Sequence, residues 1–179
     1  MIKKYKEFMK ESKSNYRRGC VLIRLDIPNW KEITSMVDIE DVYDPSGDPH
    51  GIEENPHVTI LFGLLGSIDD SDVISIINKY KYKNIEIDIN GISAFTGKEF
   101  DVVKFSVNKT QILQDFFNEL SKLPNSNEFP NYTPHVTIAY VLHGKSDKYI
   151  NPDYKLESFK IKSICYSNPN GQELEFNVY

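Results

Sequence analysis

The chain has 179 residues, of which 40% are hydrophobic and 12% aromatic, a composition that supports one ordinary globular domain. Its net charge is −5 and no long basic block stands out, which argues against strong non-specific binding to long nucleic acid. The charged start predicts no signal peptide, and the lack of about 20 consecutive apolar residues predicts no membrane span. We therefore expect a cytoplasmic location.

Hydrophobic periodicity and turn residues divide the chain into alternating elements after a polar N-terminal arm, residues 1–18, which could cover a groove. In chain order the pattern predicts helix 4–10, strand 20–27, helix 30–37, strand 57–62, helix 70–80, strands 85–92 and 100–107, helix 110–123, strand 135–142, and strands 156–166 and 173–178. This order indicates an α+β fold with mostly antiparallel sheet.

The long polar connection 38–56 leads into the strand at residue 57. A connection of that length is often functional, although a purely solvated loop fits its composition equally well. Its acidic residues lack the spacing of a calcium loop, and Cys20 and Cys165 lack the spacing of a metal site. We therefore expect no metal and two buried free thiols, while a disulfide between the two stays open.

One pentapeptide occurs twice, as Pro56-His57-Val58-Thr59-Ile60 and as Pro134-His135-Val136-Thr137-Ile138. The repeat indicates a duplicated structural unit, and each copy reads as a strand with proline at its entry. Side chains alternate along a strand, so each copy presents one histidine and one threonine on the same face. Two such strands facing each other would line a cleft with four polar side chains.

These residue types suit the cleavage of a phosphodiester. One imidazole can take the proton of the nucleophile while the other gives a proton to the leaving oxygen, and both states coexist near neutral pH. The threonine hydroxyls can donate to the phosphate oxygens, where charge develops. A lone His-x-Thr would usually be an ordinary strand sequence, whereas a matched pair combines symmetry with chemistry. The predicted catalytic residues are His57, Thr59, His135 and Thr137.

The two His-x-Thr motifs resemble the signature of the 2H phosphoesterase superfamily. That resemblance implies a bilobal α+β fold, with two pseudo-symmetric lobes around a central groove and one motif in each lobe. It also implies catalysis without metal or other cofactor.

Within that superfamily, residues 25–30, 41–44 and 54–63 look like the phage-encoded anti-CBASS phosphodiesterases. The resemblance implies hydrolysis of 3′–5′ linkages in cyclic di- and trinucleotide immune signals. It also implies an assisting tyrosine near the N-terminus, mapped to Tyr16, and an assisting glutamate near the C-terminus, mapped to Glu173 or Glu175. On the residues alone, aromatic planes suited to base stacking are present at Trp30 and Tyr132 as well as at Tyr16.

Two other functions stay open at this point. One is an enzyme of RNA ends, of the 2′–5′ RNA ligase or 2′,3′-cyclic phosphodiesterase type. The other is a nucleotide-binding sponge, which would not need an acid and a base. The sequence does not indicate the oligomeric state, the preferred bases, or which histidine is the acid.

Overall fold

The computed structural model describes residues 18–44, 51–129, 131–155 and 158–178. Its strands are β1 Gly19–Leu25, β2 His57–Leu64, β3 Glu86–Ile87, β4 Ile89–Phe95, β5 Phe100–Val107, β6 His135–Leu142, β7 Asn151–Lys155, β8 Phe159–Ser167 and β9 Glu173–Asn177. The helices are α2 Trp30–Ser35, α3 Asp70–Tyr80 and α4 Gln111–Leu120, with short 3-10 turns η1 Ile39–Asp41 and η2 Asp147–Tyr149. None of the helices in these ranges combines the length and apolar character needed to cross a membrane.

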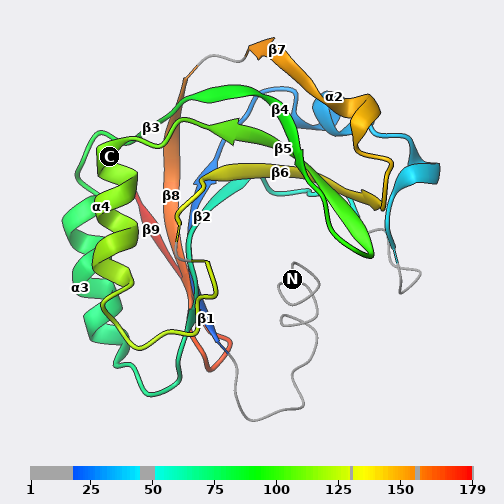
Figure 1. Ribbon diagram of the computed structural model, residues 1–179. Coiled ribbons are helices and arrows are strands. Elements are labelled where there is room, and N and C mark those ends of the chain that lie inside the picture. Colours follow the sequence, from blue (N-terminus) through cyan, green and yellow to red (C-terminus); the bar gives the residue numbers. More distant parts are fainter. Residues whose placement is uncertain (1–17, 45–50, 130, 156–157, 179) are drawn as a thin grey trace.

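The strands of the described residues form one strongly bent antiparallel sheet (Figure 1). Its order is β3-β8-β1-β2-β6-β5-β4-β7, and β9 also pairs with β8. The two strands that carry the repeated pentapeptide, β2 and β6, are therefore direct neighbours in the middle of the sheet. The expected mixed α+β class with antiparallel pairing is confirmed, but the two motif strands lie side by side and do not face each other across a cleft.

The main hydrophobic core fills the face of the sheet that the helices cover. In Figure 1, α3 and α4 lie together outside the arm formed by β1, β2 and β8. Tyr80 of α3 stacks on Phe116 of α4 with 4.3 Å between ring centroids, and both side chains are fully buried. Burying a side chain of this size stabilises the fold by about 1.5–3 kcal/mol, so the helix pair is fixed firmly against the sheet.

The helix starts differ in how they are capped. The side chain of Asp69 accepts a hydrogen bond from the Ser71 amide, and Thr110 accepts one from the Leu113 amide, as expected for polar residues at these positions. Asn29 precedes α2 but makes no such bond, because its backbone takes a left-handed conformation with φ of 59°. The side chain of Asn29 therefore does not cap this helix.

Three other expectations need correction or fall outside the described residues. The single strand expected over 85–92 is split, because β3 pairs with β8 whereas β4 pairs with β5. The polar segment after β6 contains an unexpected edge strand, β7, which pairs with β4. Helix 4–10 and the N-terminal arm up to residue 17 lie outside the described residues. Cys20 and Cys165 are both buried and outside any disulfide, as predicted.

Candidate active site

The two motifs meet at their central residues. Val58 on β2 and Val136 on β6 are opposite each other in the antiparallel ladder, and both are fully buried in the main core. Residues on either side of this pair point to the opposite face of the sheet. His57, Thr59, His135 and Thr137 consequently share the face away from the main core. The backbone contacts around the two motifs are also equivalent.

Each motif also has the same backbone setting. The Leu25 amide donates to the carbonyl of Pro56, and the Val107 amide donates to the carbonyl of Pro134. On the far side of each threonine the register with the outer neighbour slips by one residue, at Ile60 in β2 and at Ile138 in β6. Bulges of this kind bend a strand and re-aim its side chains. They occupy equivalent positions of the two motifs, so both are bent in the same place.

Both histidines are held in one tautomer. The Nδ1 atom of His57 lies 2.8 Å from the carbonyl oxygen of Asn55, and that of His135 lies 3.0 Å from the carbonyl oxygen of Thr133. A carbonyl oxygen only accepts, so Nδ1 must carry hydrogen in each ring. In the neutral imidazole Nε2 then has the free lone pair, and in the protonated form it has the transferable proton. Either histidine can therefore serve as acid or base through Nε2.

The segment that leads into the first motif is fixed along β6. The Glu53 amide donates to the Ile138 carbonyl, and the Gly51 carbonyl accepts a bond from the Tyr140 amide. On its other side, the indole nitrogen of Trp30 donates to the Glu53 carbonyl over 2.7 Å. These contacts explain how residues 51–56 of the long connection deliver His57 to its position beside the second motif.

A buried lysine stands beside the second motif. Lys104 on β5 is opposite Thr137, and Ser106 is opposite His135, so both belong to the same face as the motif side chains. Lys104 is only 4% exposed, and its burial lowers the pKa of its ammonium group. Sequence reasoning missed this residue, although a lysine inside the mostly apolar run 102–107 was a visible signal.

The surroundings of the second motif lower the pKa of His135. Burial lowers the pKa of His135 to about 4, and the positive charges of Lys104 and His57 act in the same direction. The hydrogen bond to the Thr133 carbonyl opposes this shift without cancelling it. His135 is therefore neutral over the physiological pH range.

An arginine stands beside the first motif. Arg24 on β1 is opposite His57, and its guanidinium forms an ion pair of 2.5 Å with Glu173 on β9. Its Nε also donates to the Cys165 sulfur over 3.0 Å. Burial works against the charged form, but these bonds outweigh it and raise the pKa of Arg24. The guanidinium is thus a fixed positive charge at the edge of the site.

Both C-terminal glutamates are on the motif face. Glu173 is opposite Ser167 and Glu175 is opposite Cys165, and these β8 positions share a face with Arg24 through the register of β1 with β8. Glu175 accepts a hydrogen bond of 2.6 Å from Ser163 and, with Arg24 and Asn55, lines a hollow of about 220 Å³. The structure therefore brings both glutamates to the site, and their role in substrate binding stays a prediction.

The aromatic candidates are placed differently. Trp30 packs toward Phe105 and is 8% exposed, while Tyr132 stacks on Phe117 of α4 at 4.8 Å and is 7% exposed. Both rings belong to the main core, because Phe105 points to that face of β5 and Phe117 is on the core side of α4. We expected them at the groove, and the structure does not bring them to the motif side chains. Tyr16 lies outside the described residues.

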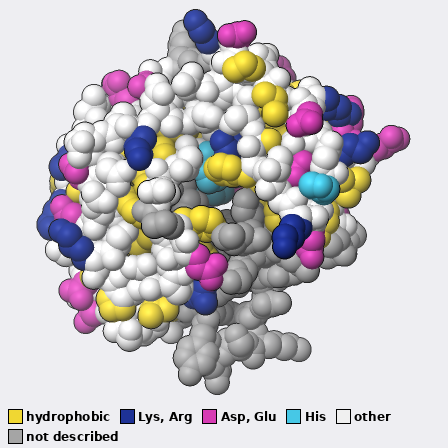
Figure 2. Space-filling model, viewed as in Figure 1, with side chains coloured by type: hydrophobic (Ala, Val, Ile, Leu, Met, Phe, Trp, Pro, Cys, Tyr) yellow, Lys and Arg dark blue, Asp and Glu magenta, His cyan; other side chains and the backbone are white. Residues whose placement is uncertain are grey.

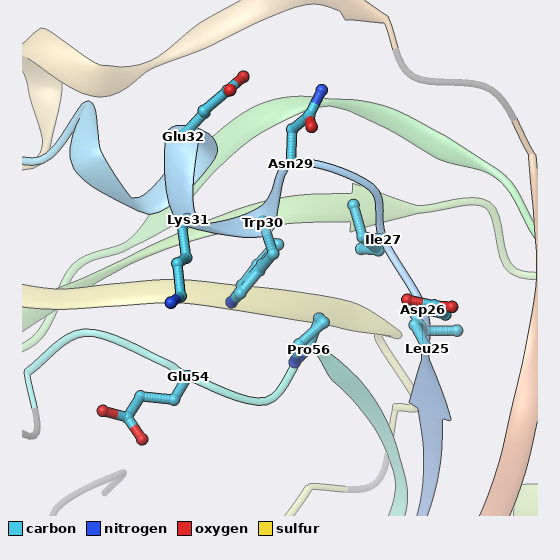
Figure 3. Close-up of a pocket in the computed structure, with 9 residues that line it drawn as sticks. All are labelled: Leu25, Asp26, Ile27, Asn29, Trp30, Lys31, Glu32, Glu54 and Pro56. Atoms are coloured by element: carbon cyan, nitrogen blue, oxygen red, sulfur yellow. The ribbon is translucent and has the colours of Figure 1, made fainter.

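Two views show the surface around these elements. Figure 2 shows a hollowed middle in this face of the molecule, with a histidine and hydrophobic side chains along it. A second hollow, of about 470 Å³, lies at the flank between the start of α2 and the segment before β2. Figure 3 shows Trp30 and Lys31 pointing from α2 toward the segment with Glu54 and Pro56. The motif side chains do not line this second hollow.

The arrangement can perform acid and base chemistry on an anionic centre. It has two imidazoles and two hydroxyls on one face, and one cation beside each motif. Within the described ranges, no three side chains of the metal-binding types are grouped so that they could hold an ion.

Comparison with known proteins identifies the family of the chain. A model of the 2′-5′ RNA ligase superfamily matches residues 26–166. The structure is similar to E. coli LigT complexed with 3′-AMP, with a TM-score of 0.59 and 12% identity over 90% of this chain and 96% of LigT. It is also similar to Usb1 of Kluyveromyces marxianus, with a TM-score of 0.57 and 9% identity over 90% of this chain and 98% of Usb1.

At these identities the structural likeness concerns the fold alone. A search of curated protein sequences gave no match. The family model, however, spans both His-x-Thr motifs and most of the chain. With the two motifs paired at the centre of one sheet, the chain belongs to the 2′-5′ RNA ligase superfamily, the 2H phosphoesterases.

Proposed function

We propose that the protein is a metal-independent phosphodiesterase that hydrolyses 3′–5′ linkages in cyclic di- or trinucleotides. The observation that carries the phosphodiesterase activity is the pairing of Val58 with Val136, which gathers two histidines and two threonines on one face. This constellation supplies an acid, a base and phosphate-oxygen donors without a metal.

The substrate is proposed on the resemblance of the first motif and its flanks to the anti-CBASS enzymes, which act in phage evasion of bacterial defence. The net charge of −5 also fits a small nucleotide better than long RNA, because long RNA is held by many phosphate contacts. Arg24 beside the first motif and Lys104 beside the second give the site local positive charge despite that balance.

In the proposed reaction, the neutral histidine takes a proton through Nε2 from the attacking water or from a ribose 2′-hydroxyl. The other histidine, protonated, gives its Nε2 proton to the leaving oxygen as the P–O bond breaks. Thr59 and Thr137 donate hydrogen bonds to the non-bridging oxygens, which gain charge in the transition state. Water attack yields a linear nucleotide directly, whereas 2′-hydroxyl attack first yields a 2′,3′-cyclic phosphate.

The second candidate is an enzyme of RNA ends, and the structural comparisons favour it. LigT was solved with 3′-AMP, and Usb1 was solved with uridine monophosphate, the latter matching with a TM-score of 0.54 at 8% identity over 90% of this chain and 98% of Usb1. Both ligands are mononucleotides, so this general fold accepts a nucleotide monophosphate in those proteins.

The decisive experiment incubates the purified full chain, in EDTA, with a panel of cyclic di- and trinucleotides and with a linear RNA that ends in a 2′,3′-cyclic phosphate. Mass spectrometry identifies the products, and the H57A variant is the matched control. Linearised cyclic nucleotides are the expected result. Opening of the RNA end alone supports the second candidate, and intact nucleotide recovered from a stable complex would make the protein a sponge.

A further inference from the structure

The two motifs are symmetric in their own contacts but not in what surrounds them. The residue opposite the threonine is Leu22 in the first motif and Lys104 in the second. The residue opposite the histidine is Arg24 in the first and Ser106 in the second. Both histidines share the contact from Nδ1 to a main-chain carbonyl, so burial and these neighbours are what can give them different proton affinities.

Lys104 is held in a defined place. Its ammonium group donates to Ser93 Oγ over 2.7 Å, and Ser93 Oγ is in turn 2.7 Å from Ser106 Oγ. The same ammonium lies 4.2 Å from the centroid of the Phe95 ring. Within the described ranges no carboxylate forms an ion pair with Lys104. A buried positive charge without a counterion disfavours a second positive charge nearby.

Phe95 connects this charge to the second histidine. Its ring meets the His135 imidazole edge to face, with 5.0 Å between centroids and an interplanar angle of 88°. One aromatic ring therefore contacts both Lys104 and His135, which places the ammonium group close to the imidazole. Around His135, β5 contributes the charge of Lys104 and β2 that of His57, while the side chains from β4, Ser93 and Phe95, are uncharged.

We propose that Lys104, held beneath Phe95, is a positioning residue whose charge adds to the burial of His135 in keeping this histidine neutral, and thereby selects His135 as the general base. His57 then supplies the proton to the leaving oxygen. This inference rests on the proposed phosphodiesterase activity for the reaction step. The relation between Lys104 and His135 does not depend on any substrate.

The experiment measures the titration of His135 directly, by NMR of histidine-labelled full-length protein, in the wild type and in K104M, K104R and K79M. Methionine keeps the length and apolar stem of lysine without its charge, and arginine keeps the charge. Lys79 is an exposed lysine on α3, paired with Glu119, and serves as the control. We expect K104M to raise the pKa of His135 by about one unit, and K104R and K79M to leave it low.

The same variants are then assayed for kcat/KM against pH with the substrate found active. The acidic limb of the profile should move to higher pH in K104M by the same amount as the NMR titration, with K104R and K79M unchanged. If K104M does not fold, K104Q replaces it. An unchanged His135 titration in the charge-free variant overturns the inference, as does a loss confined to KM, which would make Lys104 a phosphate ligand.

Failure of the proposed function gives a different result. If the protein cleaves none of the tested nucleotides but the His135 titration still shifts in K104M, the relation between Lys104 and His135 stands. Only the phosphodiesterase assignment is then overturned.

Discussion

Val58 and Val136, the middle residues of the two identical pentapeptides, are opposite each other in the sheet. This pairing gives the two repeated strands a local two-fold arrangement. The histidine of the first motif lies toward the threonine of the second, and the histidine of the second motif lies toward the threonine of the first. The pairing of β2 with β6 brings together two motifs that are far apart in the sequence. The site is therefore built on two central strands instead of mobile loops.

Replacing either motif histidine should nearly abolish turnover. H57A or H135A is expected to lower kcat by about 10²–10⁴-fold, because each removes one proton-transfer group from the transition state. The measurement is product formation by mass spectrometry, with circular dichroism to verify the fold. A rate near that of the wild type in either variant contradicts the two-histidine mechanism.

The threonine hydroxyls should matter through the transition state. T59V and T137V preserve shape and remove one donor each, and we expect kcat to fall by about 10²–10³-fold with a smaller change in KM. Thr110, which caps α4 away from the site, is the control, since T110V should cost only about 1 kcal/mol of stability and leave kcat unchanged. An effect on KM alone would assign the threonines to ground-state binding.

Activity should not require a divalent ion. We expect the same rate in EDTA as in magnesium or manganese, because the histidines and threonines together supply the acid, base and phosphate donors. The comparison uses protein dialysed against chelator and assayed with and without added metal. Loss of activity in EDTA that a divalent ion restores would reveal a metal site and contradict this prediction.

Stability should fall as the pH drops through the titration range of His135. Its pKa of about 4 in the folded protein lies below the ordinary value of 6.5, so between these values the unfolded chain binds a proton that the folded chain does not. The free energy of unfolding then rises with pH over this interval and this contribution is constant above it. Urea unfolding of the wild type and H135A at pH 4.5 and 7 checks this, since the variant should lose less stability at the lower pH.

The ion pair between Arg24 and Glu173 should have a larger role in activity than in stability. Both side chains are partly exposed, so E173Q is expected to change the free energy of unfolding by less than about 1 kcal/mol. Releasing Arg24 beside His57 should nevertheless lower kcat/KM by about tenfold or more, because the guanidinium is no longer fixed beside the phosphate site. Equal kcat/KM in E173Q and the wild type would assign Glu173 a structural role only.

The sequence alone was enough to predict the fold class and most elements. The strands expected at 20–27 and 173–178 are present as β1 and β9, and the alternation of Glu173–Asn177 places both glutamates of β9 on one face. Prediction from the sequence failed for strands whose pairing is non-local. It missed the separation of β3 from β4 and the edge strand β7, because β3 and β7 are stabilised by partners far along the chain.

The amino-acid sequence by itself determined the two His-x-Thr motifs and the chemistry that they can perform, because alternation along a strand is a local property of the backbone. Only the tertiary structure decided that the motifs are neighbours in one sheet, that Trp30 and Tyr132 belong to the core, and that Lys104 lies beside His135. Those relationships depend on sheet order and register, which arise from packing between segments that the sequence pattern cannot pair.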